Sequence, residues 1–232
     1  MLRIFIVGFN NKKGGIESYI SNLNDSLDHT KFEVIYSLPE MTIDGKVWIR
    51  PKNRHNYLAY KRFWHKFFKF NKFDVIYYNT CDIVSVDMLK FAKAANIPIR
   101  IIHSHNTNVQ QKLRLIHKFT EKYNRKHIED YATHLFACSG DAGKWMFGDK
   151  HFTVLKNGID ISKYKYSDAK REACRSNLKT KKQKVIGCVG RLDPQKNPLF
   201  ALKIMKAVKA LDNNTAFVFI GDGILKDELC AE

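Results

Sequence analysis

Short apolar runs alternate with longer amphipathic stretches along this chain. The apolar runs cover residues 2–7, 32–38, 74–78, 99–103, 134–139, 152–156, 185–189 and 216–220. Short runs of this kind are typical of strands buried in a parallel sheet. Stretches with helical periodicity lie between them, at 16–27, 57–72, 87–95, 109–131 and 199–210. The alternation predicts an α/β fold built on parallel sheets.

The segment 161–182 interrupts this alternation. It is polar and rich in Lys and Arg, with one short helix expected near 169–178, and it separates two blocks of strand and helix signals. We therefore predict a Rossmann-like domain over 1–160, a linker over 161–183, and the first, incomplete part of a second Rossmann-like domain over 184–232.

Composition narrows the class of protein. The chain has 232 residues, of which 44% are hydrophobic and 12% aromatic, which excludes a disordered chain. A net charge of +17 predicts an acidic partner, which could be nucleic acid, anionic lipid or a phosphorylated substrate. Five cysteines without a C-x-x-C pair indicate reduced packing residues in a cytosolic protein. Neither a secretory leader nor a membrane-spanning stretch is expected.

The stretch 184–198, KVIGCVGRLDPQKNP, combines a strand, a glycine turn and two cations. Gly190 allows a sharp turn at the carboxyl end of the strand, where open α/β sheets bind ligands. Arg191 offers a planar fork for phosphate oxygens and Lys196 offers a second point charge. We interpret this stretch as a diphosphate clamp; the alternative is that both cations are simply solvated on a loop.

Two further strand ends carry candidate chemistry. Gly14 and Gly15 open a helix after the first strand, so the backbone N–H groups there could bind an anion, or the glycines could only form a turn. The spacing does not match a Walker P-loop. The run His103-Ser104-His105-Asn106 ends a buried strand. A histidine there could donate a hydrogen bond to a substrate oxygen, or it could be satisfied by a loop carbonyl. With neither a carboxylate nor a cysteine nearby, it makes a poor zinc set.

The helical stretch Tyr57–Lys72 separates into an aromatic arc and a cationic arc. One arc holds Tyr60, Phe63, Trp64, Phe67, Phe68 and Phe70, and the other holds Lys61, Arg62, His65, Lys66, Lys69 and Lys72. This pattern predicts a helix lying on anionic lipid, although core packing with a solvated face produces the same pattern. A second basic helix over 109–131 adds modestly to the membrane interpretation.

Taken together, five motifs in order resemble one family. They are Gly14-Gly15-Ile16-Glu17, His103-Ser104-His105-Asn106, Asn157-Gly158-Ile159-Asp160, Gly190-Arg191-Leu192 with Lys196-Asn197-Pro198, and Gly221-Asp222-Gly223. The chain resembles the retaining GT-B glycosyltransferases of capsular and exopolysaccharide synthesis, called family 4 or group 1. The resemblance implies two Rossmann-like domains facing a cleft, with the acceptor bound by the N-terminal half and a nucleotide-sugar donor held mainly by the C-terminal half.

The resemblance also implies roles for residues and partners. Arg191 and Lys196 would hold the donor diphosphate, and Gly15 would lie near it. A histidine of the His103–Asn106 run would face the transferred sugar, and we favour His105 over His103 because it precedes Asn106. The donor, expected to be UDP-linked, and a lipid-linked saccharide acceptor are the implied partners, at the inner face of the plasma membrane. The donor side would comprise Gly14, Gly15, Arg191, Lys196, Gly221 and Gly223, and acceptor or turn positions would be Glu17, Asn106, Ser139 and Asn157.

The resemblance also bears on metal ions, cofactors and the length of the chain. The cations would replace a metal, so neither a metal nor a cofactor is expected. The family continues for about another half-domain with a pair of glutamates that hold the donor, so we expect this chain to be a fragment with weak or no activity.

The alternative function is a basic protein that binds nucleic acid or anionic membrane without catalysis. Nucleic acid is not the expected partner, because the sequence lacks a recognition-helix or zinc-finger pattern.

Overall fold

The computed structural model describes residues 1–8, 14–37, 47–48, 55–107, 114–180 and 183–232. The chain divides into two compact units, Met1–Asp160 and Ile161–Glu232. Each unit has a parallel sheet of its own, as the alternation of apolar runs and helices predicts. None of the described helices is long and apolar enough to cross a bilayer.

Unit 1 is built on a seven-stranded parallel sheet in the order β3-β2-β1-β4-β5-β6-β7. The strands are β1 (Leu2–Val7), β2 (Phe32–Ser37), β3 (Val47–Trp48), β4 (Val75–Thr80), β5 (Ile99–Ser104), β6 (His134–Ala137) and β7 (Thr153–Val154). The strand order runs outward in both directions from the β1–β4 pair. Such a reversal is the place where open α/β sheets bind ligands, at the carboxyl ends of the strands.

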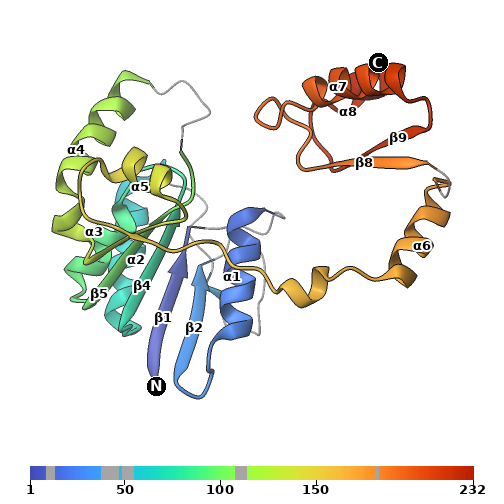
Figure 1. Ribbon diagram of the computed structural model, residues 1–232. Coiled ribbons are helices and arrows are strands. Elements are labelled where there is room, and N and C mark those ends of the chain that lie inside the picture. Colours follow the sequence, from blue (N-terminus) through green and yellow to red (C-terminus); the bar gives the residue numbers. More distant parts are fainter. Residues whose placement is uncertain (9–13, 38–46, 49–54, 108–113, 181–182) are drawn as a thin grey trace. The chain divides into compact units, whose positions relative to one another are not determined.

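Helices cover both faces of this sheet (Figure 1). They are α1 (Gly15–Ser26), α2 (Tyr57–Phe70), α3 (Asp87–Ala94), α4 (Leu115–Tyr131) and α5 (Gly140–Phe147). Because strand side chains alternate between faces, Ile6 and Tyr77 pack with Tyr19 and Ile20 of α1, while Phe5 and Ile76 belong to a larger cluster with the other helices. The sheet is therefore buried on both sides, which is why its strands lack polar alternation.

Four of the six aromatic residues in the arc of α2 pack in the core, whereas Phe63 and Phe70 are exposed. This corrects the interpretation of the whole arc as a lipid-inserting surface. Tyr60, Trp64, Phe67 and Phe68 are all buried in the larger cluster, where Phe5 of β1 contacts the last three rings. Helical periodicity marks which residues share a face, but it does not say what covers that face. The cationic arc of Lys61, Arg62, Lys66 and Lys69 is exposed, so any attraction of α2 to anionic lipid would be electrostatic.

Unit 2 contains the parallel pair β8 (Lys184–Val189) and β9 (Thr215–Ile220). Its helices are the 3₁₀ turn η1 (Ile161–Tyr164), α6 (Asp168–Asn177), α7 (Pro198–Leu211) and α8 (Lys226–Ala231). The segment predicted as a linker thus carries η1 and α6, and its contacts group it with unit 2. Asn197 caps α7 in a left-handed conformation, and Pro198 at the first helical position starts the helix as the sequence predicts.

Candidate functional site at the carboxyl ends of the strands

The carboxyl ends of β1, β4 and β5 bring Gly8, Asn79 and His105 together in unit 1. Strand pairing sets Asn79 of β4 beside His103 of β5, and His105 follows β5 directly. Gly8 follows β1 with φ of +89°, and a Cβ atom there would lie 1.7 Å from the carbonyl oxygen of Asn79. Only glycine fits this close approach of two backbones. These strand ends form the candidate site of unit 1.

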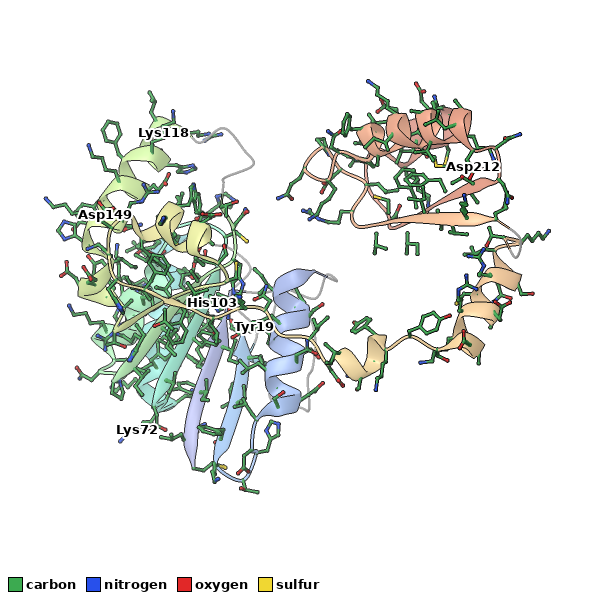
Figure 2. All side chains as sticks on the ribbon, viewed as in Figure 1. Tyr19, Lys72, His103, Lys118, Asp149 and Asp212 are labelled. Atoms are coloured by element: carbon green, nitrogen blue, oxygen red, sulfur yellow. The ribbon has the colours of Figure 1, made fainter. Side chains whose placement is uncertain are left out.

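A chain of hydrogen bonds runs behind the site from α1 into the sheet. The hydroxyl oxygens of Tyr19 and Tyr77 are 2.8 Å apart, and the Tyr77 hydroxyl lies 2.7 Å from Nδ1 of His103. His103 is 0% exposed, so it does not reach the surface. Figure 2 shows Tyr19 and His103 close together between the sheet and α1. His103 therefore lies behind the site, as a support for the residues in front of it.

His105 is held in one tautomer by Asn79. Its Nε2 lies 2.9 Å from Oδ1 of Asn79, and Nδ2 of Asn79 donates to the carbonyl oxygen of Val7 at 3.4 Å. Since the Asn79 amide nitrogen faces the Val7 carbonyl, its oxygen accepts from His105, and Nε2 must carry the proton. The His103 ring lies below, with ring centroids 4.0 Å apart. Asn79 and His103 thus orient His105.

Burial keeps both histidines neutral. The pKa of His103 is lowered to about 3, mainly by burial and to a smaller extent by the neighbouring His105. A hydrogen bond with the Leu155 backbone acts in the opposite direction. Burial lowers the pKa of His105 to about 4. Burial likewise raises the pKa of the Tyr19 and Tyr77 hydroxyls. At neutral pH the imidazoles and hydroxyls of this site are therefore uncharged.

Acidification tests these pKa values. In the folded chain both histidines have pKa values below the ordinary value near 6.5. As the pH falls from 7 to 5, these histidines therefore become protonated in the unfolded chain but stay neutral in the folded chain. The unfolding free energy is expected to fall by up to about 1.4 kcal/mol per pH unit for each histidine. Urea unfolding at pH 7, 6 and 5 measures this slope.

Variants identify the source of the slope. His103→Gln and His105→Gln should each flatten it, whereas the same change at the exposed His151 should leave it as it is in the unmodified chain. A slope that neither site variant alters would contradict the burial of neutral imidazoles.

The remaining predicted positions of unit 1 mainly have structural contacts. Ser139 caps α5, with its hydroxyl accepting from the Ala142 N–H at 3.1 Å. Asn106 accepts from the Thr107 N–H at 2.9 Å. Asn157 is exposed beside Gly158, whose carbonyl accepts from Asn22 of α1 at 3.0 Å.

Gly14 and Gly15 begin α1 at the same edge of the sheet. Gly14 is the N-cap residue and makes no side-chain cap, and a Cβ atom there would lie 2.5 Å from a carboxylate oxygen of Glu17. The Glu17 carboxylate thus lies at the positive end of the helix dipole, where anions are favoured. Gly15 has open space around its Cα.

Sequence reasoning did not single out Asn79, Tyr77 or Tyr19, although an Asn-Thr pair ending an apolar run is a detectable signal.

In unit 2, Arg191 and Lys196 follow the Gly190 turn after β8, as predicted. The Arg191 guanidinium lies 3.0 Å from a carboxylate oxygen of Asp193 and donates to Gln195 at 2.5 Å. Both cations are exposed, and the ion pair with Asp193 is therefore weak. Asp193, which the sequence interpretation did not name, orients the guanidinium of Arg191. Because this ion pair is weak, another anion can replace the Asp193 carboxylate.

Close packing explains the glycines of the second turn. A Cβ atom on Gly221 would lie 1.8 Å from the Gly190 carbonyl oxygen, and one on Gly223 would lie 2.4 Å from that of Leu192. The backbone bond from Leu192 N–H to the Asp222 carbonyl, 2.9 Å long, holds the two turns together. Gly221 and Gly223 therefore shape the loop that carries Arg191, whatever that loop binds.

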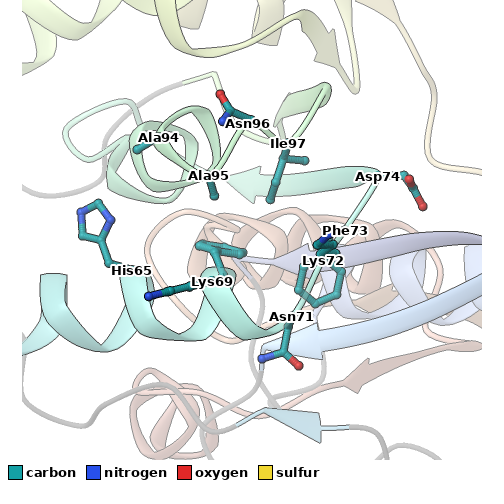
Figure 3. Close-up of a pocket in the computed structure, with 11 residues that line it drawn as sticks. His65, Lys69, Asn71, Lys72, Phe73, Asp74, Ala94, Ala95, Asn96 and Ile97 are labelled. Atoms are coloured by element: carbon teal, nitrogen blue, oxygen red, sulfur yellow. The ribbon is translucent and has the colours of Figure 1, made fainter.

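A hollow of about 580 Å³ lies elsewhere on unit 1. His65, Lys69 and Lys72 line it together with the residues that precede β4 and β5 (Figure 3). It therefore opens near the amino ends of these strands, away from the candidate site. Among the described residues no group of three His, Cys, Asp or Glu side chains could hold a metal ion.

Comparison with known proteins finds a family similar to the second unit. Residues 169–232 match the family described as Glycosyl transferases group 1. EpsF of Bacillus subtilis, which is named as a glycosyltransferase, is 26% identical over 94% of this chain and 61% of its own length. The chain is related to the group 1 glycosyltransferases.

One further relative and one solved structure are also similar to this chain. The UDP-Gal:alpha-D-GlcNAc-diphosphoundecaprenol alpha-1,3-galactosyltransferase of Escherichia coli is 25% identical over 71% of this chain and 44% of its own length. HepE of Anabaena, solved with UDP and glucose, has a TM-score of 0.71 at 18% identity, covering 100% of this chain and 64% of HepE. These likenesses confirm the predicted α/β fold of GT-B type with Rossmann-like units. The chain spans about three fifths of EpsF and less than half of the E. coli enzyme.

Proposed function

We propose that this protein transfers a hexosyl group from a UDP-linked sugar to a lipid-linked saccharide in surface polysaccharide synthesis, with retention at the anomeric carbon and without a metal ion. The observation that carries the proposal is the pair Arg191 and Lys196 on the Gly190 turn, within the segment that matches the glycosyltransferase family. The undecaprenol-linked acceptor of the E. coli relative and the UDP complex of HepE support the two substrates.

The chemistry of the leaving group fits these cations. When the sugar leaves, negative charge grows on the diphosphate oxygens, and cations held in place beforehand lower the barrier. Arg191 can exchange Asp193 for a phosphate because their ion pair is exposed. Lys196, on the same loop, adds a second positive charge. Its ammonium group acts as a point charge and does not need the planar two-bond geometry of a guanidinium. These two charges would do the work that a divalent cation does in metal-dependent transferases.

The unit 1 site would bind sugar. His105 presents a neutral imidazole whose tautomer Asn79 sets, and neutral donors and acceptors match hydroxyl groups. We assign His105 to the transferred sugar and His103 to its support, because His103 is wholly buried. Gly14 and Gly15 would bring the first turn of α1 close to the donor. With a lipid-linked acceptor, the protein would work at the inner face of the plasma membrane.

Removing either cation tests the clamp. Arg191→Ala and Lys196→Ala should each weaken UDP binding, measured by calorimetry on the whole chain, by about 1–3 kcal/mol, or roughly 5- to 150-fold. The reason is the loss of a charge-assisted contact to the diphosphate. Transfer from UDP-sugars to a lipid-linked acceptor should fall in parallel wherever it is measurable.

Lys203→Ala is the matched control, since Lys203 is an exposed cation on α7 of the same unit. It should leave UDP affinity unchanged. If all three variants bind UDP as the unmodified chain does, Arg191 and Lys196 are only solvated loop cations and do not form a diphosphate clamp.

A further inference from the structure

The outer face of α4 carries two parallel stripes of side chains. Leu115, Phe119 and Tyr123 are spaced four residues apart, and Leu115 and Phe119 are 74% and 73% exposed. Beside them, Lys118, Lys122 and Lys126 repeat with the same spacing, and all three are exposed. Residues four apart lie on one face of a helix, so each set forms a continuous row. We call residues 115–126 of this face the α4 surface.

The rest of α4 is anchored by its inner face. The amide of Asn124, which is buried, donates to the carbonyl oxygens of Ile83 and Val84 at 2.9 and 3.1 Å, and Ile128 is also fully buried. Figure 2 shows Lys118 near the beginning of α4. Burial on the inner side therefore leaves the apolar row of the outer side facing water, which is costly unless a partner covers it.

The lysine row is electrostatically uncompensated among the described residues. The acidic neighbours on α4 have other partners: Glu121 pairs with Arg125 at 2.6 Å, Asp130 pairs with His127 at 2.9 Å, and Glu129 pairs with Lys150. None of the described ion pairs involves Lys118, Lys122 or Lys126. The row therefore favours a partner with negative charge next to apolar material.

We infer that the α4 surface docks on an anionic lipid bilayer. The apolar row would enter the boundary between headgroups and acyl chains, and the lysine row would contact anionic headgroups. Leu115 and the exposed Ile116 are aliphatic and cannot stack on bases, which argues against nucleic acid. The chain's own second unit is an unsuitable cover, because 161–232 contains 15 Lys and Arg against 8 Asp and Glu.

This inference does not rest on the proposed transfer reaction, because vesicle binding is measured without substrate. It also replaces α2 as the membrane-facing element. Most of the aromatic arc of α2 is buried, with Tyr60, Trp64, Phe67 and Phe68 in the core. The α4 surface instead exposes apolar and cationic side chains together.

Vesicle flotation with the whole chain tests the inference. Binding to phosphatidylcholine vesicles containing phosphatidylglycerol should be strong at low salt and weak to phosphatidylcholine alone. Changing Lys118, Lys122 and Lys126 to Gln should weaken binding about five-fold per lysine, on the order of 100-fold together. A Leu115→Gln, Phe119→Gln variant should also release the protein, and amide exchange over 115–126 should slow on vesicles only in the unmodified chain.

A second charge variant controls for net charge. Lys61, Lys66 and Lys69 of α2 are exposed, and changing them to Gln removes the same charge from another face. That variant should keep most of the binding, and all variants should retain the far-UV dichroism and melting temperature of the unmodified chain. Equal losses in the α2 and α4 charge variants, unaltered binding by the Leu115 and Phe119 variant, or binding to single-stranded RNA that depends on the same residues would each overturn the inference. So would an unmodified chain that ignores anionic vesicles.

Discussion

Replacing Trp64 by alanine is expected to lower the unfolding free energy of unit 1 by about 3–5 kcal/mol. The indole is 0% exposed, and aromatic rings from β1 and α2 surround it: Phe5 at 5.9 Å, Tyr60 at 6.2 Å, Phe67 at 5.4 Å and Phe68 at 5.8 Å between centroids. Truncation removes the transfer free energy of the ring and leaves a cavity that a dense core cannot close. Denaturant unfolding followed by far-UV dichroism measures the loss.

Phe70→Ala is the matched control on the same helix. Its ring is exposed, so the variant should stay within about 0.5 kcal/mol of the unmodified chain. Equal stability of the Trp64 and Phe70 variants would mean that the four buried rings of the aromatic arc of α2 do not form core packing. The interpretation of that arc as a lipid-binding surface would then return.

Gly8→Ala is expected to destabilise unit 1 by roughly 2–5 kcal/mol. The φ of +89° strains any residue with a side chain, and the new methyl group would overlap the Asn79 carbonyl oxygen. The backbone of β4 would have to move away from β1. Because the Asn79 amide fixes His105, this movement should also loosen the histidine. Thermal unfolding measures the first effect and imidazole NMR shifts measure the second.

Gly15→Ala provides the comparison, since a methyl group there meets nothing within 4 Å. It lies in the first turn of α1, where alanine favours the helix. Its melting temperature should equal or exceed that of the unmodified chain. If Gly8→Ala melts at the same temperature as Gly15→Ala, the close approach of β1 and β4 is wrong.

The strands, the helices and the turns that carry the cations could be predicted from sequence alone. The short apolar runs 99–103 and 185–189 both predict strands, and both form strands in the structure. The burial predicted for 185–189 is wrong, because Val189 is 76% exposed and Ile186 is 40% exposed. The glycine turn at Gly190 determines where Arg191 follows the strand. These features depend on neighbours in the chain. For that reason the fold class and the position of the loop that carries Arg191 and Lys196 follow from the pattern of residues.

The contacts of the candidate site could not be predicted in the same way. Asn79 meets His105 only because β4 pairs with β5 in one register, and the Tyr19–Tyr77–His103 chain joins α1, β4 and β5. Register between strands is a property of the assembled sheet, so residues far apart in sequence acquire their partners only on folding.

The helices α2 and α4 show which of their properties follow from the sequence and which follow only from the tertiary structure. For both α2 and α4 the sequence determines which side chains share a face, because that follows from 3.6 residues per turn. Only the tertiary structure decides what covers each face. Four aromatic residues of α2, Tyr60, Trp64, Phe67 and Phe68, are buried in the core. Leu115 and Phe119 of α4 are exposed beside a row of lysines. The physical reason is that burial depends on which surfaces the rest of the fold makes available to the helix.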